Sequence, residues 1–171
     1  MRLGYRIRQF FGGVFARVSQ EERREADAVL TPAARAWFHS LPRDLQWHGL
    51  QVMHDLQRAG VDRADVLAAA LLHDAGKAES VNGPLVRAFI VLARRLLPGW
   101  YARQQQLDYR AARGLDRVVA VARQHPQIAA ERAAQCGCDP VTIDLIRRHQ
   151  DAPRGPDDAL LQLFQRVDDQ N

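Results

Sequence analysis

Apolar residues recur three and four positions apart along almost the whole sequence, which is the spacing of one face of an α-helix. No stretch alternates apolar and polar residues for long enough to predict a β-strand. The length of 171 residues is enough for one domain with a sizeable core and too short for two. We therefore expect an all-α fold, a bundle of helices in a single domain.

Prolines, glycines and capping residues divide this pattern into separate helices. Thr31-Pro32 is a typical helix start, because threonine caps the first turn and proline fits the first helical position. We expect helices to begin at Thr31-Pro32, Pro42, Asp62, Pro84, Pro126, Pro140 and about Asp157. The ends that we expect are Gly60, about Ala75, Pro98-Gly99, Gly137 and about His149.

Residues 1–19 combine arginines with apolar residues at helical spacing and contain no acidic residue. The arginines are spread through the segment, which argues against a signal peptide. Two interpretations stay open: an amphipathic helix packed on the protein's own core, or a cationic helix lying on an anionic membrane surface. We assign residues 1–30 to a basic, helical N-terminal extension and residues 31–171 to the folded domain.

Charge and cysteine content exclude several classes of protein. The net charge of +4 would tolerate an anionic ligand but is too small to predict a nucleic-acid duplex as a partner. Cys136 and Cys138 are the only cysteines, so no disulfide framework is expected. The longest apolar run, residues 66–72, is too short to span a membrane. We expect a cytoplasmic protein, with membrane contact through residues 1–19 as the alternative.

The clearest chemical feature is His73-Asp74, which follows two helical turns of alanine, leucine and valine. Polar side chains at such a position are costly to bury unless they are paired or bind a metal. An imidazole nitrogen with a carboxylate oxygen suits Fe, Mn, Co, Ni or Zn, and one carboxylate can bridge two cations. Lys77 follows one turn later and has two interpretations: a phosphate-binding ammonium, or a solvated lysine at a helix C-terminus.

The segment "LLHDAGK", which contains these residues, resembles the signature of the HD superfamily of metal-dependent phosphohydrolases. The likeness covers about residues 40–171, because "QWHGLQV" is similar to the upstream histidine element and "RQHPQIAAERAAQCGCDPVTIDLIRRHQ" to the second half of the dinuclear members. Those members include cyclic-dinucleotide phosphodiesterases and symmetrical bis(nucleosyl)-tetraphosphatases. The metal ligands that the resemblance implies are His48, His73, Asp74, His125, His149 and Asp168.

The sequence also departs from the dinuclear pattern. Ala129 stands where the "HPxxG" element has glycine, and the Gly-Tyr-Pro element is absent, which disfavours the cyclic-dinucleotide enzymes. The chain between the central acid and the third histidine is longer than in the compact enzymes, and its surplus is the apolar segment 84–98. Asp169 beside Asp168 leaves the last ligand ambiguous, and Asp44 is a further weak candidate.

The resemblance implies one or two divalent cations per chain, Fe, Mn, Co, Ni or Zn with Mg also admitted, and attack of a metal-bound hydroxide on phosphorus. Asp74 would be the bridging carboxylate, and Lys77 would hold a phosphate oxygen. The expected substrate is a small phosphate ester or anhydride of a nucleotide, with dinucleoside polyphosphates ahead of cyclic dinucleotides. Two alternatives stay open: a non-catalytic HD module that senses a ligand or binds a partner, and an HD-type di-iron oxygenase.

Overall fold

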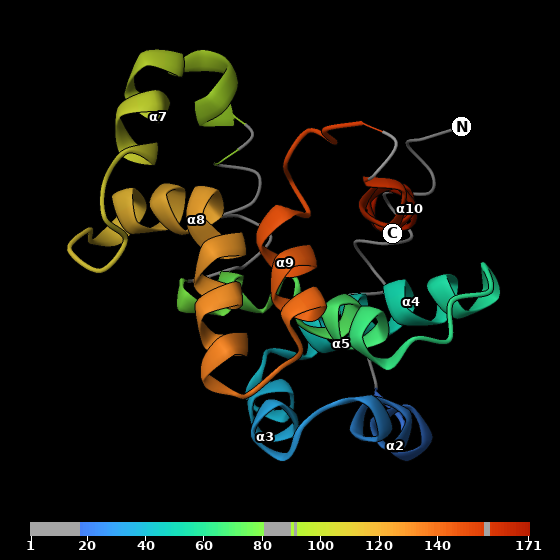
Figure 1. Cartoon of the computed structure of the whole chain (residues 1–171). Coiled ribbons are helices and arrows are strands. Elements are labelled where there is room, and N and C mark those ends of the chain that lie inside the picture. Colours follow the sequence, from blue (N-terminus) through green and yellow to red (C-terminus); the bar gives the residue numbers. More distant parts are fainter. Residues whose placement is uncertain (1–17, 81–89, 91, 156–157) are drawn as a thin grey trace.

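The computed structural model describes residues 18–80, 90, 92–155 and 158–171. Within these residues every regular element is a helix and no strand occurs, which confirms the all-α prediction (Figure 1). The elements are α2 (Gln20–Val29), α3 (Pro32–Ser40), α4 (Arg43–Arg58), α5 (Ala64–Leu72), the 3₁₀ helix η1 (Ala75–Glu79), α7 (Pro98–Gln105), α8 (Gly114–Gln135), α9 (Pro140–Arg148) and α10 (Ala159–Asp168).

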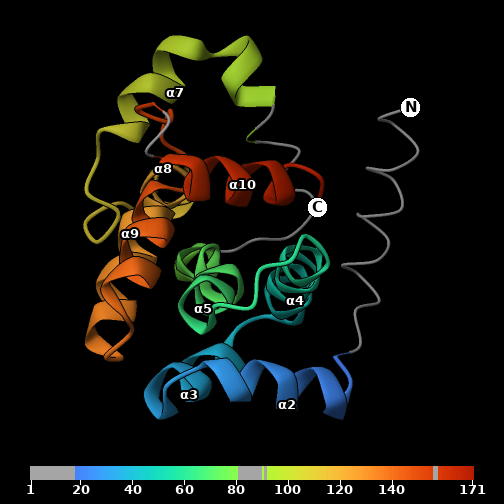
Figure 2. The same ribbon diagram turned by 45° about the vertical axis from the view of Figure 1, so that its right-hand side comes forward.

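Helix α5 lies at the centre of the bundle. Its neighbours are α4 on one side and α9 on another, while α2 packs across it from one end of the molecule. Helix α8 lies beside α9 and η1, and α10 covers α4 (Figure 2). This position follows from the composition of α5, because residues 66–72 are all apolar and must be covered on every side.

The buried core is continuous through these helices. Its largest fully buried side chains include Phe38, Leu50, Leu72, Ile146 and Phe164, which come from different elements. Ala26 and Leu30, at the end of α2, belong to the same core. None of the helices among the described residues is long and apolar enough to cross a membrane.

Where a capping residue followed by proline marks the start of a helix in the sequence, the helix begins at the predicted position. The Thr31 side chain accepts a hydrogen bond from Ala34 N, and Pro32 is the first residue of α3. Asp139 caps α9 in the same way, ahead of Pro140. The prediction of a helix from Pro42 is confirmed to within one residue, because Pro42 is the N-cap of α4.

Other predicted boundaries are wrong. Helix α5 begins at Ala64 after Arg63, with no side-chain cap, so Asp62 does not start it. It ends at Leu72 and not near Ala75, because the chain tightens into η1. The helical residues 92–96 do end before Pro98, as predicted, but Pro98 also opens α7, in whose first turn its missing N–H is not needed.

Pro126 does not start a helix either. It lies inside α8, which runs unbroken from Gly114 to Gln135. The N-terminal amphipathic helix predicted within residues 1–19 falls almost wholly on residues 1–17, which lie outside the described residues, as do residues 82–84 and 156–157.

Candidate metal centre

Five segments bring their imidazole and carboxylate groups to one place in the bundle. His48 lies in the middle of α4, and His73 and Asp74 follow directly after α5. Two more histidines come from α8 and α9, and a second carboxylate comes from the last turn of α10. The residues brought together are those that the sequence singled out: His48, His73, Asp74, His125, His149 and Asp168.

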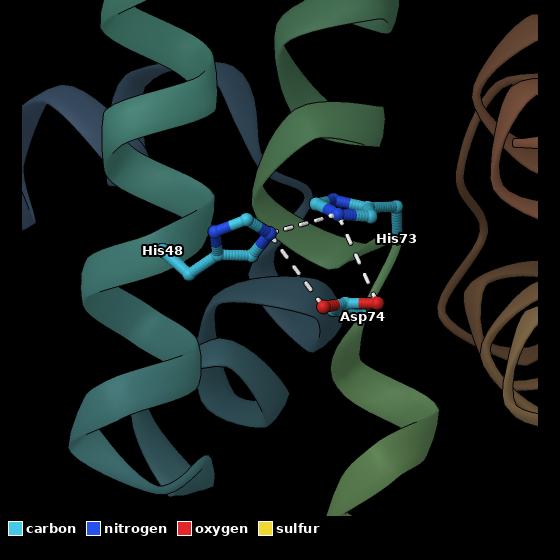
Figure 3. Close-up of side chains that lie close together, drawn as sticks. All are labelled: His48, His73 and Asp74. Atoms are coloured by element: carbon cyan, nitrogen blue, oxygen red, sulfur yellow. Dashed lines mark hydrogen bonds and ion pairs between the residues drawn. The ribbon is translucent and has the colours of Figure 1, made fainter. Parts of the chain in front are cut away.

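The first group of these side chains is His48, His73 and Asp74, which point toward one another across the gap between α4 and the end of α5 (Figure 3). The Nε2 atoms of His48 and His73 are 3.3 Å apart, and Oδ2 of Asp74 lies 3.6 Å from His48 Nε2. Asp168 closes the group, because its Oδ1 lies 3.1 Å from His48 Nε2 and 3.2 Å from His73 Nε2. Asp169 is exposed, so the geometry favours Asp168 as the ligand.

The second group shares Asp74 with the first and adds His125 and His149. The other oxygen of Asp74, Oδ1, lies 3.2 Å from His125 Nε2 and 3.8 Å from His149 Nε2. The two imidazoles are 3.3 Å apart at their Nε2 atoms. Asp74 therefore lies between two sets of nitrogen ligands: Oδ2 faces His48, whereas Oδ1 faces His125 and His149 and also lies 3.8 Å from His73 Nε2.

Three of the imidazoles are oriented by the same contact. The Nδ1 atoms of His73, His125 and His149 each donate to the carbonyl oxygen three residues earlier, at 2.9, 3.0 and 2.7 Å. In a neutral imidazole this leaves Nε2 as the atom with a free lone pair. The Nε2 lone pairs of His125 and His149, 3.3 Å apart, repel unless a proton or a cation lies between them, so the donor set fits a metal ion.

The accepting carbonyls are available because no helical N–H takes them. Ala70 and Ile146 lie in the last turns of α5 and α9, where carbonyls lack an intrahelical partner. Ala122 lies inside α8, but the residue four positions later is Pro126, which has no N–H to donate. The proline thus frees the carbonyl that orients the imidazole of His125.

Two glycines allow the helices to approach closely enough for these contacts. A Cβ atom on Gly49, beside His48, would lie 2.8 Å from Leu71 O, so only glycine lets α4 meet α5 at this point. A Cβ on Gly76 would lie 2.3 Å from the carbonyl oxygen of His125. Gly76 therefore sets the distance between η1 and α8, and with it the distance between Asp74 and His125.

The charges of the cluster perturb its pKa values. Burial opposes ionisation of Asp74, but the charges of Lys77 and His73 outweigh it and hold the pKa of that carboxyl well below its usual range. Burial likewise opposes charge on His73, yet Asp74 and Asp168 raise its pKa. Burial, together with the charge of His73, lowers the pKa of His149 to about 4. Near neutral pH His149 is therefore neutral, and the second group can bind a cation without releasing a proton from this imidazole.

Lys77 belongs to the cluster. Its ammonium donates to Oδ2 of Asp74 at 2.5 Å, and about a third (34%) of its side chain stays exposed. The ammonium therefore lies between the buried carboxylate and the solvent. Lys77 is therefore paired with a buried carboxylate of the cluster and is not simply solvated at a helix end.

The remaining two histidines lie outside the cluster. His39 pairs with Asp27 at 2.8 Å, and His54 pairs with Glu25 at 2.8 Å, both across the contact with α2. Asp44 belongs to neither of the two ligand groups found in the described part of the chain.

Several residues around the site were not predicted. Gln150 places its amide nitrogen 3.4 Å from His125 Nε2, beside the second group. Gln165 donates to the carbonyls of His149 and Asp151 at 3.0 and 2.7 Å, and so ties α10 to the end of α9. No signal in the sequence marks these glutamines, because each contact joins residues that are more than ten positions apart along the chain and belong to no known motif.

The cluster as a whole is a candidate metal centre. Imidazole nitrogens and carboxylate oxygens, buried and already oriented by carbonyls, are the ligands that Fe, Mn, Co, Ni and Zn bind in proteins. The two groups could hold one cation each through the shared Asp74. Comparison of the chain with protein-family models, with curated proteins and with solved structures finds no match.

Proposed function

We propose that this chain is a metal-dependent phosphohydrolase of the HD superfamily, acting on a small phosphate ester or anhydride. The observation that carries the proposal is the position of Asp74 between two sets of imidazoles, with Oδ2 toward His48 and Oδ1 toward His125. A carboxylate placed in this way suits a pair of cations better than a single one. The order of the ligands along the chain resembles that of the dinuclear HD enzymes.

Phosphate chemistry suits the groups at this site. Bound divalent cations would lower the pKa of a water molecule and offset the negative charge that builds up on phosphate oxygens. The chain itself would supply the holding and orienting groups. Lys77, half turned to solvent, would donate to a phosphate oxygen, and the amide of Gln150 lies where it would donate to another.

For the substrate we propose a nucleotide, with dinucleoside polyphosphates ahead of cyclic dinucleotides. The reason is the short spacing of His125, His149 and Asp168, which resembles that of the compact tetraphosphatases more than that of the Gly-Tyr-Pro enzymes. The net charge of +4 and the exposed side of Lys77 add a general attraction for polyanions.

The test combines metal content with hydrolysis of phosphate substrates. Protein purified without chelator is expected to contain about two transition-metal ions per chain. With Mn²⁺ or Fe²⁺ present, it should hydrolyse diadenosine tetraphosphate to two ADP, or a nucleoside monophosphate to nucleoside and phosphate, faster than it opens cyclic dinucleotides. Asp74→Asn should lose both the metal and the activity while remaining folded. Asp169→Asn makes the same change at the exposed neighbour of Asp168 and should keep both.

Three results would contradict the proposal. An Asp74→Asn protein that keeps its metal and its activity would remove the bridging role. Oxygen uptake without hydrolysis of any phosphate substrate would identify an oxygenase. Absence of bound metal and of turnover in the wild-type protein would leave a non-catalytic module.

A further inference from the structure

The exposed apolar side chains of this protein are concentrated in one region. Among the described residues, the large hydrophobic side chains left exposed are all found between positions 92 and 115. They are Leu92 (55% exposed), Leu96 (63%), Leu97 (55%), Leu107 (39%) and Leu115 (49%). A cluster of exposed leucines on an otherwise well-buried core marks a surface that has a partner.

Three of these leucines lie on a single projecting turn. Residues 92–96 are helical, and the buried Ala93 (3% exposed) holds this helix against the protein. Leu92 and Leu96 are one turn apart and share a face. Leu97 forms the corner to α7, because its N–H donates to Ala93 O and its carbonyl accepts from Tyr101 N, both at 2.9 Å. This part lies at the end of the molecule opposite α2 and α3 (Figures 1 and 2).

All the charged residues between Glu79 and Asp108 are positive, because the sequence contains no aspartate or glutamate between these two positions. Arg94 and Arg95 are exposed between the leucines, and Arg103 is exposed on α7. Leucines on both sides of a pair of arginines complement a bilayer of anionic lipids, in which acyl chains lie directly beneath phosphate groups.

We propose that Leu92, Arg94, Arg95, Leu96 and Leu97, here called the leucine–arginine patch, dock this protein on the surface of an anionic lipid bilayer. The leucines insert between acyl chains, and the guanidinium groups bind lipid phosphates at the interface. The patch acts independently of residues 1–19, and the inference does not depend on the phosphohydrolase activity.

Co-sedimentation of the full chain with lipid vesicles tests this. The wild-type protein should sediment with vesicles of equal parts phosphatidylcholine and phosphatidylglycerol, and much less with phosphatidylcholine alone. Leu96→Ser with Leu97→Ser should weaken binding about tenfold per leucine. Arg94→Gln with Arg95→Gln should weaken it about fivefold per arginine and reduce its dependence on salt.

Matched variants separate the patch from general charge and from the N-terminal segment. Arg24→Gln with Arg43→Gln removes the same charge from other exposed positions and should bind vesicles nearly as the wild type does. Arg2→Gln, Arg6→Gln and Arg8→Gln together should leave a dependence on Leu96 and Leu97. Because the leucines are exposed, thermal unfolding of the patch variants should match that of the wild type.

The proposal is overturned if the patch variants bind vesicles as well as the wild type does, or if only the changes in residues 1–19 abolish binding. It is also overturned if the wild type does not bind vesicles and sedimentation velocity shows a self-association that Leu96→Ser with Leu97→Ser removes. The patch would then be an interface between copies of the chain.

Discussion

At the scale of single residues, the imidazoles of this site are prepared for a cation by contacts to the backbone. His73, His125 and His149 each give the Nδ1 proton to a carbonyl three residues earlier, so that Nε2 faces the carboxylate of Asp74. Partners of this kind fix the ring orientation and typically change metal affinity by 10- to 100-fold. The site therefore depends on helix ends as much as on the ligands themselves.

Lys77 gives the first prediction at this scale. Lys77→Met keeps most of the side-chain length and removes the ammonium, so the metal should stay bound while phosphate loses a charged hydrogen bond. We expect KM for a phosphate substrate to rise about tenfold or more, with a smaller fall in kcat. Steady-state kinetics with the metal content measured in parallel tests this, and Arg24→Gln, which removes an exposed charge on α2, is the control. A fall in kcat at constant KM would place the ammonium in the chemical step.

The residues of the cluster could be predicted from the sequence, but their supporting residues could not. His73 and Asp74 stand out because polar residues directly after seven consecutive apolar residues need a partner. Gln165 supports His149 from a different helix, and Asn171 ties the end of α10 to α4 by donating to Asp55 at 2.8 Å. Amide side chains of this kind occur on any surface, so their residue type and spacing carry no information about the contact.

At the scale of elements, the close approach of η1 and α8 leads to a prediction about Gly76. Gly76→Ala would put a methyl group 2.3 Å from the carbonyl oxygen of His125 and force the two elements apart. The group formed by His125 and His149 should lose its cation while the group with His48 keeps one. We also expect a loss of stability of about 1–3 kcal/mol.

Metal analysis and thermal unfolding check the Gly76 prediction. Gly99→Ala is the matched control, since a Cβ there meets nothing within 4 Å. Unchanged metal content in Gly76→Ala would mean that the packing of η1 on α8 does not position His125.

Pro126 carries the second prediction at this scale. Pro126→Ala restores a backbone N–H that competes with the imidazole of His125 for the carbonyl of Ala122. We expect the affinity for the second cation to fall about tenfold or more, with the helix content unchanged. Metal titration with circular dichroism tests this, and Pro140→Ala, at the first position of α9, should behave as the wild type. Equal affinities in both variants would contradict the role of the proline.

The elements themselves were predictable where a local signal decides the boundary. Thr31 and Asp139 bond to their own helices, so the sequence around each is sufficient. Pro126 is different, because its lost hydrogen bond is replaced by a side chain that is oriented toward the metal centre, and a proline therefore sits inside a helix. Predicting helix boundaries from neighbouring residues alone cannot anticipate that the imidazole of His125 replaces the missing N–H of Pro126.

At the scale of the whole molecule, the bundle brings His73 and His149 into one cluster, yet it shifts their pKa values in opposite directions. Protons and cations compete for the same nitrogens. Burial is outweighed at His73 by Asp74 and Asp168, which raise its pKa above that of an exposed histidine. At His149, burial and the charge of His73 act together and lower the pKa to about 4. Acid should therefore act on the two ligand groups at different pH values.

The last prediction is that the two cations leave in separate steps as the pH falls. Protons should compete more strongly with the cation at His73 than at His149, so the cation of the His48 group should be lost at a higher pH than the cation held by His125 and His149. In the metal-free protein, the lowered pKa of His149 also makes the stability of the fold depend on pH. Neutral His149 stabilises the fold fully above pH 6.5, and this contribution is lost as the pH falls from 6.5 toward 4, because the unfolded chain takes the proton first.

Equilibrium dialysis across this pH range, with elemental analysis and thermal unfolding at each point, measures both effects. His149→Ala should remove the lower step and leave the upper one, whereas His54→Gln, which changes a histidine paired with Glu25 away from the site, should change neither. Loss of both cations in one step, or earlier loss from the His149 group, would show that the charges of Asp74 and Asp168 do not separate the two groups.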